Sequence, residues 1–361
     1  MTSIQGYIPP SLPLHHELET KAVLKKAIAA NTALAKLNGV AVRIPNQAVL
    51  INALVLQEAK DSSEIENIIT THDDLYRSSI DDTHLTQAVK EVRHYGEALR
   101  KGFELVTHNK LLLVKDIIQI QSILEKNDAG IRKQGGTQLK NDQTGEVVFI
   151  PPQYENDIRN ALANLERYIN DAKLDDIDPL IKMAVIHHQF ETIHPFYDGN
   201  GRTGRILNIL YLVLSELLDL PILYLSRYIT THKADYYRLL QKVRTDQAWE
   251  EWALFMLEGI EQTANQTIQL IYQIDELMQK TALEIQAFPG KLYSKDLVEA
   301  LFVHPYTRIE FIEQRLAVSR QTASKYLKQL EALGILHSTQ LGNGKYFINH
   351  RFYELLSRPQ S

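Results

Sequence analysis

The sequence of 361 residues has no cysteine, only two tryptophans and four methionines, and no unbroken apolar run long enough to cross a membrane. The lack of cysteine excludes disulfides, thiolate metal sites, iron–sulfur clusters and cysteine nucleophiles. The most apolar stretch, 206–225, contains Asn208, Glu216, Asp219 and Pro221, so it predicts a buried helix. The start MTSIQGYIPP lacks the basic and apolar regions of a signal peptide, and we expect a cytoplasmic protein without membrane contact.

The remaining composition, 44% hydrophobic and 23% charged, is that of a globular protein with room for two or three domains. The charge is unevenly distributed along the chain. Residues 290–361 carry 10 Lys/Arg against 6 Asp/Glu, whereas residues 1–289 carry 29 against 38. Pro289 and Gly290 end a long helical pattern at the same point. We therefore predict a separate tail domain over 286–361, after an N-terminal segment over 1–110 and a core over 111–285.

Apolar residues recur with the period of an α-helix through most of the first 289 positions, which predicts an all-α body. Residues 136–152 are the exception, because β-branched and aromatic residues followed by two prolines predict a β-hairpin flap. The proline-rich arm at 7–13 is expected to be extended and packed. The predicted helices cover 17–37, 47–59, 84–106, 115–124, 156–169, 179–190, 202–218, 233–243 and 248–285.

The densest group of polar residues is the segment HPFYDGNGRTGR at 194–205, which lies between two predicted helices. Gly199–Gly201 allow successive backbone N–H groups to form a concave nest at a helix N-terminus, where an anion is favoured. Arg202 and Arg205 lie one turn apart and can hold phosphate oxygens. Asp198 is a ligand type that Mg²⁺ prefers, and His194 is a base that titrates near neutrality. The segment therefore predicts a polyphosphate site suited to phosphoryl or nucleotidyl transfer.

The same glycines also fit a dinucleotide-binding fingerprint, since Gly199, Gly201 and Gly204 have its spacing and Asp219 follows about 20 residues on. That fingerprint requires a strand before the glycines, and 179–190 instead predicts a helix. A dinucleotide site is the weaker interpretation for this reason.

A hydrolytic metal site is another interpretation, with His187, His188, His194 and Asp198 as ligands. The chain has no HExxH motif, and packing or hydrogen bonding inside a helix is the simpler prediction for His187 and His188. A glycine-rich loop with solvated charges is the remaining interpretation, but it leaves unexplained why every charged group suits phosphate.

Residues 194–205 match the signature of the Fic family, HxFx[DE]GNGRxxR, at every fixed position. The proline-rich arm, the hairpin end at 149–152, the stretch 225–229 and the pair Tyr236-Tyr237 extend the resemblance to bacterial Fic proteins that carry an N-terminal segment and a C-terminal winged helix. The resemblance implies a helical Fic core with a hairpin flap, followed by a winged helix-turn-helix domain. It also implies AMPylation, in which AMP from Mg·ATP is transferred to a Ser, Thr or Tyr hydroxyl of a protein and pyrophosphate is released.

The resemblance further implies roles for individual residues. His194 would deprotonate the target hydroxyl, Asp198 would hold Mg²⁺, Arg202 would bind the β-phosphate and Arg205 the γ-phosphate, while Phe196 would anchor the loop. The other expected ATP contacts are Gly199, Asn200, Gly201, Thr203 and Gly204 in the loop, and Tyr236, Tyr237 and Arg244 around the adenosine, where core packing is the alternative role. Val147 and Val148 would form the flap edge that binds the target segment by strand addition.

A second motif, SSEIEN at 62–67, fits the inhibitory pattern [ST]xxxE[GN] of this family. Ser62 and Glu66 lie one turn apart, and we expect them on a short helix capped by Ser62 or Ser63. The resemblance implies that Glu66 pairs with Arg205 and forces ATP into an unproductive pose. The isolated enzyme would then be nearly inactive, and removal of AMP from modified targets is a further activity that the resemblance allows.

The tail has the element order of a winged helix over 306–348. A helix over 308–316, a turn capped by Ser319, a second helix over 320–333 and a hairpin over 335–348 are predicted. The polar face of the second helix is a candidate DNA-binding surface. The alternative is packing against another protein, in particular a second copy to give a homodimer. The candidate DNA-binding residues are Arg320, Gln321, Ser324, Lys325 and Lys328.

Two other functions remain open at the level of the sequence. In one, the chain is a nucleotide-sensing, DNA-binding transcription regulator whose Fic body modifies only itself. In the other, a Fic-type enzyme transfers a different moiety, such as phosphate, phosphocholine or UMP. The presence of both Arg202 and Arg205 favours a triphosphate donor, because a donor without a γ-phosphate leaves Arg205 without a ligand.

Overall fold

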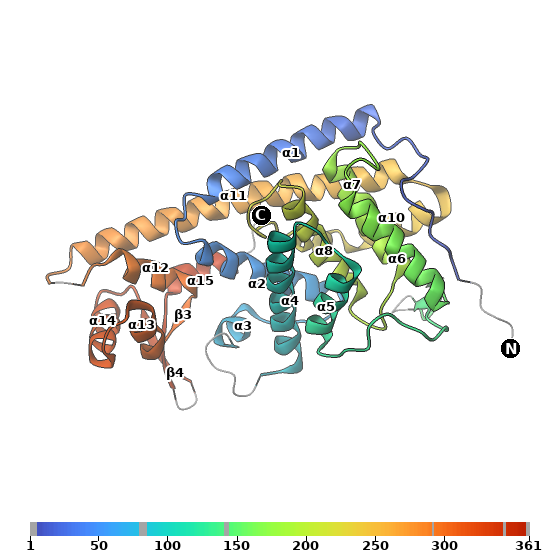
Figure 1. Ribbon diagram of the computed structural model, residues 1–361. Coiled ribbons are helices and arrows are strands. Elements are labelled where there is room, and N and C mark those ends of the chain that lie inside the picture. Colours follow the sequence, from blue (N-terminus) through green and yellow to red (C-terminus); the bar gives the residue numbers. More distant parts are fainter. Residues whose placement is uncertain (1–5, 79–84, 141–143, 291, 342–343, 359–361) are drawn as a thin grey trace.

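The computed structural model describes residues 6–78, 85–140, 144–290, 292–341 and 344–358. Within these ranges the chain forms fifteen helices and five short strands (Figure 1), which confirms the prediction of an all-α fold with a small β-hairpin. The tip of the predicted hairpin, 141–143, lies outside the described residues. Among the helices described, none is both long and apolar enough to span a bilayer.

Polar caps fix the starts of several helices in the body. The side chains of Thr20, Asn46, Thr86 and Asp178 each accept a hydrogen bond from the first turn of the helix that follows. The helices and strands of the first half are α1 (Lys21–Ala41), α2 (Gln47–Ile65), α3 (His72–Ser78), α4 (Gln87–Asn109), α5 (Val114–Glu125), β1 (Leu139–Lys140), β2 (Val147–Phe149) and α6 (Glu155–Asn170).

The second half of the chain completes the body and forms the tail. Four short helices, α3, α9, α12 and α15, are not predicted by the sequence, because six to nine residues contain too few turns to show a period. The elements are α7 (Pro179–Ile193), α8 (Asn200–Leu214), α9 (Ser226–Thr231), α10 (Lys233–Asp246), α11 (Trp249–Gln286), α12 (Lys295–Val303), β3 (Tyr306–Thr307), α13 (Ile309–Leu316), α14 (Arg320–Ala332), β4 (His337–Leu341), β5 (Gly344–Ile348) and α15 (His350–Ser357).

The centre of the body is formed by α7 and α8. Every residue of α7 from Leu180 to Ile193 is buried, because α1, α6, α8 and α11 surround it. Helix α8 packs on α7 and also contacts α4 and α5. The segment HPFYDG, which joins α7 to α8, is therefore held at both ends by fully packed helices. A loop supported in this way is a suitable place for precise chemistry.

Two long helices, α1 and α11, lie side by side along one edge of the molecule (Figure 1). With 38 residues, α11 is about 57 Å long at 1.5 Å per residue. Its first part packs on α7, α9 and α10, and its last part contacts α12 and α15 of the tail. This helix thus links α7, which ends at the motif loop, with α12 and α15 of the tail.

The tail contains the elements that the sequence predicts. Ser319 caps α14 by accepting a hydrogen bond from the Thr322 amide, and β3, β5 and β4 form a three-stranded antiparallel sheet in that order. The tail also contacts the body near the predicted inhibitory motif. The hydroxyl of Tyr306 donates to Asp73 at 2.5 Å, and the Gln57 side-chain amide on α2 donates to the carbonyl of Leu356 at 2.5 Å.

Candidate active site

The motif loop is shaped by two residues in the left-handed region of backbone conformation. His194 ends α7 with φ 49°, and Gly199 precedes α8 with φ 76°. Phe196 between them is fully buried, with its ring centroid 6.3 Å from that of Phe190, so it anchors the loop as expected. The loop reverses the chain and brings His194, the start of α8 and both arginines to one side of the body.

The side chain of Asn200 is bound within the loop. Its side-chain oxygen accepts a hydrogen bond from the Phe196 amide at 2.8 Å, and its side-chain nitrogen donates to the Phe196 carbonyl at 2.9 Å. The phosphate contact expected of Asn200 stays a prediction. Asn200 closes the loop, and Gly199, Gly201, Thr203 and Gly204 lie around the first turn of α8, where the helix offers its N-terminal amides.

His194 is held by a residue that the sequence does not point to, Arg132. The Nε of Arg132 donates to the His194 carbonyl at 2.8 Å, its backbone amide donates to Pro195, and its guanidinium reaches the carbonyl of Pro152 at the base of the flap. Burial, together with the positive charges of Arg132 and Arg244, lowers the pKa of His194 to about 4. The imidazole is neutral at pH 7 and is able to accept a proton.

Arg205 is bound by the end of α2. Its guanidinium donates to the Ser62 hydroxyl at 2.8 Å, to the Ser62 carbonyl at 3.0 Å and to the Glu66 carboxylate at 2.8 Å. Burial by itself would raise the pKa of Glu66, but the adjacent Arg205 outweighs it and holds that pKa below the usual range. A Cβ on Gly201 would collide with the Glu66 carboxylate, so the glycine makes this close approach feasible. The contact expected between Glu66 and Arg205 is present in the structure.

The local structure around Ser62 differs from the expectation. Ser62 and Ser63 do not cap a short helix. They lie in the last turn of α2, which continues through Ile65, and Glu66 is the C-terminal cap. Apolar periodicity ends at Ala59 because the next residues are polar, yet Asp61, Ser62 and Ser63 are all buried against the body. Tertiary packing therefore extends the helix beyond the pattern that sequence reasoning can detect.

Arg202 is also bound by carboxylates, which the sequence does not predict. Its side chain is only 5% exposed, with Glu125 at 2.9 Å and Glu91 at 3.3 Å from its two terminal nitrogens. Glu91 lies on α4 and Glu125 is the last residue of α5, more than 70 residues from Arg202 in the sequence. Both arginines expected to bind phosphate are thus paired with glutamates in this structure.

Asp198 fits a Mg²⁺ site in which the phosphates of the substrate supply further ligands. Its side chain is exposed at the loop, and one oxygen accepts a hydrogen bond from the Gly199 amide at 2.7 Å. Mg²⁺ is commonly held by one or two carboxylates together with phosphate oxygens. In the described ranges no three His, Cys, Asp or Glu residues are grouped as a preformed metal centre. His187 and His188 are buried and hydrogen-bonded, to Tyr236 and the Leu240 carbonyl, as the packing interpretation predicts.

The three expected adenosine contacts are placed differently from one another. Tyr236 is buried, with its hydroxyl 2.8 Å from His187 and its ring among Trp252 and Phe255, which is a core position. Tyr237 is 45% exposed on the same helix. Arg244 lies 3.8 Å from the ring centroid of Phe149 on the flap, so it belongs to the flap side of the site.

The flap presents an exposed edge beside a groove of about 350 Å³. Val147 and Val148 are 40% and 46% exposed, while Phe149 is buried and pairs with Leu139. The backbone amide of Tyr7, in the extended N-terminal arm, donates to the Ile150 carbonyl at 2.8 Å. The arm is packed as predicted, and the flap retains a surface on which a peptide strand can be aligned.

A further carboxylate, that of Glu191 on α7, lies against Gly204, and the sequence does not indicate it. Its side chain is buried, and burial raises its pKa to about 7 although Arg205 and Arg244 act in the opposite direction. The four residues that sequence reasoning misses, Glu91, Glu125, Arg132 and Glu191, are single charged residues outside the motif. No spacing distinguishes them from surface charges, because only the folded chain brings them to the loop.

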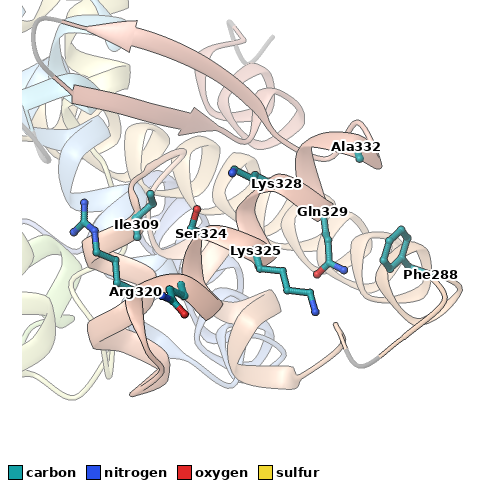
Figure 2. Close-up of a pocket in the computed structure, with 9 residues that line it drawn as sticks. Phe288, Ile309, Arg320, Ser324, Lys325, Lys328, Gln329 and Ala332 are labelled. Carbon is teal, nitrogen blue, oxygen red and sulfur yellow. The ribbon is translucent and has the colours of Figure 1, made fainter.

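The five candidate DNA-binding residues lie together in the tail. They line one groove of about 670 Å³ along α14, which we call the tail groove. Figure 2 shows its side chains along the helix, from Arg320 at one end to Gln329 and Ala332 at the other, with Phe288 beside that second end. The groove is lined by Phe288, Ile309, Arg320, Gln321, Ser324, Lys325, Lys328, Gln329 and Ala332.

Comparison with known proteins finds family matches for three segments of the chain. Residues 24–104 match a family model described as Fic/DOC family N-terminal, and residues 111–212 match the Fic/DOC family model. Residues 277–352 match the C-terminal domain of SoFic-like protein adenylyltransferases. The chain is 30% identical over 125 residues to the protein adenylyltransferase fic-1 of Caenorhabditis elegans, a match that covers 33% of this chain and 24% of that protein.

A longer match is to a probable protein adenylyltransferase of Aquifex aeolicus, 30% identical over 198 residues, or 54% of this chain and 58% of that protein. Among solved structures, a Fic family protein from Desulfovibrio desulfuricans G20 has a TM-score of 0.59 at 20% identity, covering 91% of this chain and 96% of that one. A Fic-1 fragment from C. elegans has a TM-score of 0.52 at 19% identity, covering 72% and 73%. These likenesses establish the fold, and with its N-terminal segment and its motif loop both matched, the chain belongs to the Fic/DOC family.

Proposed function

We propose that this chain is a cytoplasmic protein adenylyltransferase that transfers AMP from Mg·ATP to a Ser, Thr or Tyr hydroxyl of a protein and is inhibited by its own Glu66. The observation that carries the proposal is the binding of Arg205 by Ser62 and Glu66 beside an intact motif loop. The curated relatives named as adenylyltransferases support the same reaction. The guanidinium of Arg205, which is proposed to bind the γ-phosphate, is already paired with Ser62 and Glu66, so ATP would have to compete with them for it.

The arrangement of residues suggests how the reaction proceeds. The neutral imidazole of His194 removes the proton from the target hydroxyl, whose oxygen attacks the α-phosphorus. The bond from the α-phosphorus to the bridging oxygen breaks, and pyrophosphate leaves with the electron pair. Arg202, Arg205 and the first amides of α8 bind the leaving phosphates, and Asp198 would hold Mg²⁺, which would supply neutralisation of charge on the phosphate oxygens. The exposed edge of the flap aligns the target strand.

The test uses ATP labelled at either the α- or the γ-phosphate. Wild type, Glu66→Gly and Glu66→Gly/His194→Ala are incubated with Mg²⁺ and cell lysate, and label on protein is followed. We expect label from the α-position only, strong in Glu66→Gly and absent when His194 is also replaced. Label from the γ-position would contradict adenylyl transfer in favour of phosphate transfer. Equal α-label in wild type and Glu66→Gly would contradict the inhibitory role of Glu66.

A second candidate function, DNA binding, is favoured by the tail groove. All five residues that the sequence analysis selected for a DNA contact line it, and the acidic residues of α13 and α14 are absent from its lining. Replacing Lys325 and Lys328 by alanine should weaken binding to a labelled duplex and lower the slope of log affinity against log salt by about two. Lys295→Ala is the control, because Lys295 is an exposed lysine of α12 outside the groove lining. An unchanged affinity would favour the alternative, a homodimer interface, which sedimentation would detect as a doubled mass.

A further inference from the structure

Arg202 sits in a pocket of negative charge. The carboxylates of Glu91 and Glu125 pair with Arg202, that of Glu66 pairs with Arg205, and that of Asp198 lies close to Glu125. The formal charge of this group is −2. A nucleotide polyphosphate would add further negative charge to the same place. Binding therefore requires that at least one carboxylate moves away or is neutralised.

Glu125 lies directly against the start of α8. One of its oxygens is 2.9 Å from Arg202, and a Cβ on Gly199 would collide with the same oxygen. The carboxylate thus lies against the residue that precedes α8, at the positive end of a helix that has no side-chain cap. An anion at a helix N-terminus and on an arginine occupies the position that a phosphate would prefer.

The surroundings of Glu125 also fit a group that can be displaced. Burial, with Asp198, Glu91 and Glu66 close by, raises its pKa, so these neighbours work against its charge. Among these charged side chains, Arg202 favours the charged form. Because Glu125 is the last residue of α5 and Lys126 follows in the left-handed region, the side chain lies at an end of a helix rather than within it.

We propose that Glu125, supported by Glu91, is a second carboxylate that holds Arg202 and must be displaced by the β-phosphate of the incoming nucleotide. The inference rests on the proposed function, since it assigns Arg202 to the β-phosphate and Arg205 to the γ-phosphate. Each arginine then has its own competing carboxylate, Glu125 for Arg202 and Glu66 for Arg205. Glu66 opposes only nucleotides with a γ-phosphate, whereas Glu125 opposes every nucleotide that carries a β-phosphate. Glu125 in this way sets the preference of the site among AMP, ADP and ATP.

The effects of Glu66 and Glu125 can be distinguished by measuring the affinity of the protein for AMP, ADP and ATP, each with Mg²⁺, by titration calorimetry. We expect Glu125→Gln to strengthen ADP and ATP binding relative to AMP by about tenfold, the size of one competing charge-assisted hydrogen bond. Glu66→Gly should strengthen ATP relative to ADP and leave the ratio of ADP to AMP unchanged. Glu91→Gln should act like Glu125→Gln but more weakly, because its contact is longer.

Glu97→Gln is the matched control, since Glu97 pairs with Lys126 beside Glu125 but both side chains are exposed and contact no motif residue. Thermal unfolding of each variant shows whether the fold is retained. An unchanged or lowered ratio of ADP to AMP affinity in a folded Glu125→Gln protein, while Glu66→Gly still strengthens ATP, overturns the role of Glu125 and leaves the proposed function intact. If no variant binds any of the three nucleotides, both proposals are wrong.

Discussion

At the scale of single residues, the site depends on a few side chains whose partners lie far away in the sequence. His194 is neutral because burial and two arginines disfavour its positive charge, and Arg205 is held by Ser62 and Glu66. The motif can be found from the sequence because its twelve residues are contiguous. Glu125 and Arg132 cannot, because a single Glu or Arg has no spacing to mark it, and their significance arises only from the contacts made on folding.

The pKa of His194 gives a prediction for the released enzyme. Because the base must be neutral and its pKa is lowered to about 4, AMP transfer by Glu66→Gly should stay constant from pH 8 down to pH 6. The rate should fall only as the pH approaches 4. Adding His194→Ala should lower the single-turnover rate about 100-fold or more while ATP binding persists. The pH profile of initial rates checks this, and a midpoint near 6.5 would contradict a base shielded by burial.

At the scale of elements, helix α2 ends at Glu66, the proposed inhibitory residue, and also buries two acidic side chains, Glu58 and Asp61. Glu58 accepts hydrogen bonds from the Ser226 amide and hydroxyl and from Tyr95, and it is 1% exposed. Burial raises the pKa of Glu58 to about 7 and that of Asp61 to about 6. The helix is therefore attached to α9 and α4 through Glu58, a carboxyl group whose pKa is raised by burial.

These carboxyl groups predict how stability depends on pH. The folded state holds the Glu58 proton more tightly than the unfolded state, so the contribution of Glu58 to the free energy of unfolding should fall as the pH rises from about 4.5 to 7. This loss is up to about 3 kcal/mol. Buried histidines whose pKa is lowered act in the opposite direction, so urea unfolding of wild type and of Glu58→Gln at pH 5 and pH 8 is compared, and the change between the two proteins gives the part due to Glu58. A Glu58→Gln protein with the same pH dependence as wild type would show that other groups govern it.

The flap is the element expected to select the target. Proline at 148 would remove a backbone donor from its exposed edge and hinder strand pairing. In the Glu66→Gly background, Val148→Pro should lower kcat/KM for a protein target about tenfold, the effect of losing roughly one backbone hydrogen bond. The affinity for ATP should not change. Glu146→Ala, next to the flap strand, is the control, and an equal loss in that variant would point to a general distortion of the hairpin.

At the scale of the whole molecule, the tail and helix α2 are parts of one packed body. Helix α11 contacts α12 and α15 of the tail, α12 packs on α2, and the Leu356 carbonyl accepts a hydrogen bond from Gln57. The charge and the turn residues of the sequence indicate the tail, and its two predicted helices, α13 and α14, are confirmed. Its attachment to α2 is not predictable, because α12 and α15, which make that contact, are too short to show a period.

This attachment predicts cooperative unfolding. Leu356 on α15 is buried, and Leu356→Ala should cost about 3 kcal/mol of stability. Calorimetry should show a single transition moved to lower temperature, and hydrogen exchange should accelerate in α2 as well as in α15. The exposed Glu354→Ala, on the same helix, is the control. A separate early transition of the tail, with α2 unaffected, would contradict the coupling.

Arg132 joins three parts of the chain through carbonyl oxygens. Its side chain holds the carbonyls of His194 and of Pro152, and its amide holds that of Pro195. The flap proposed to bind the target peptide and the proposed base, His194, are therefore both held by the side chain of Arg132. In an engineered chimera, a foreign flap would support chemistry only if it returned a carbonyl to this guanidinium. The exchangeable unit for redesigning target choice is thus 132–152 as a whole, not the hairpin alone.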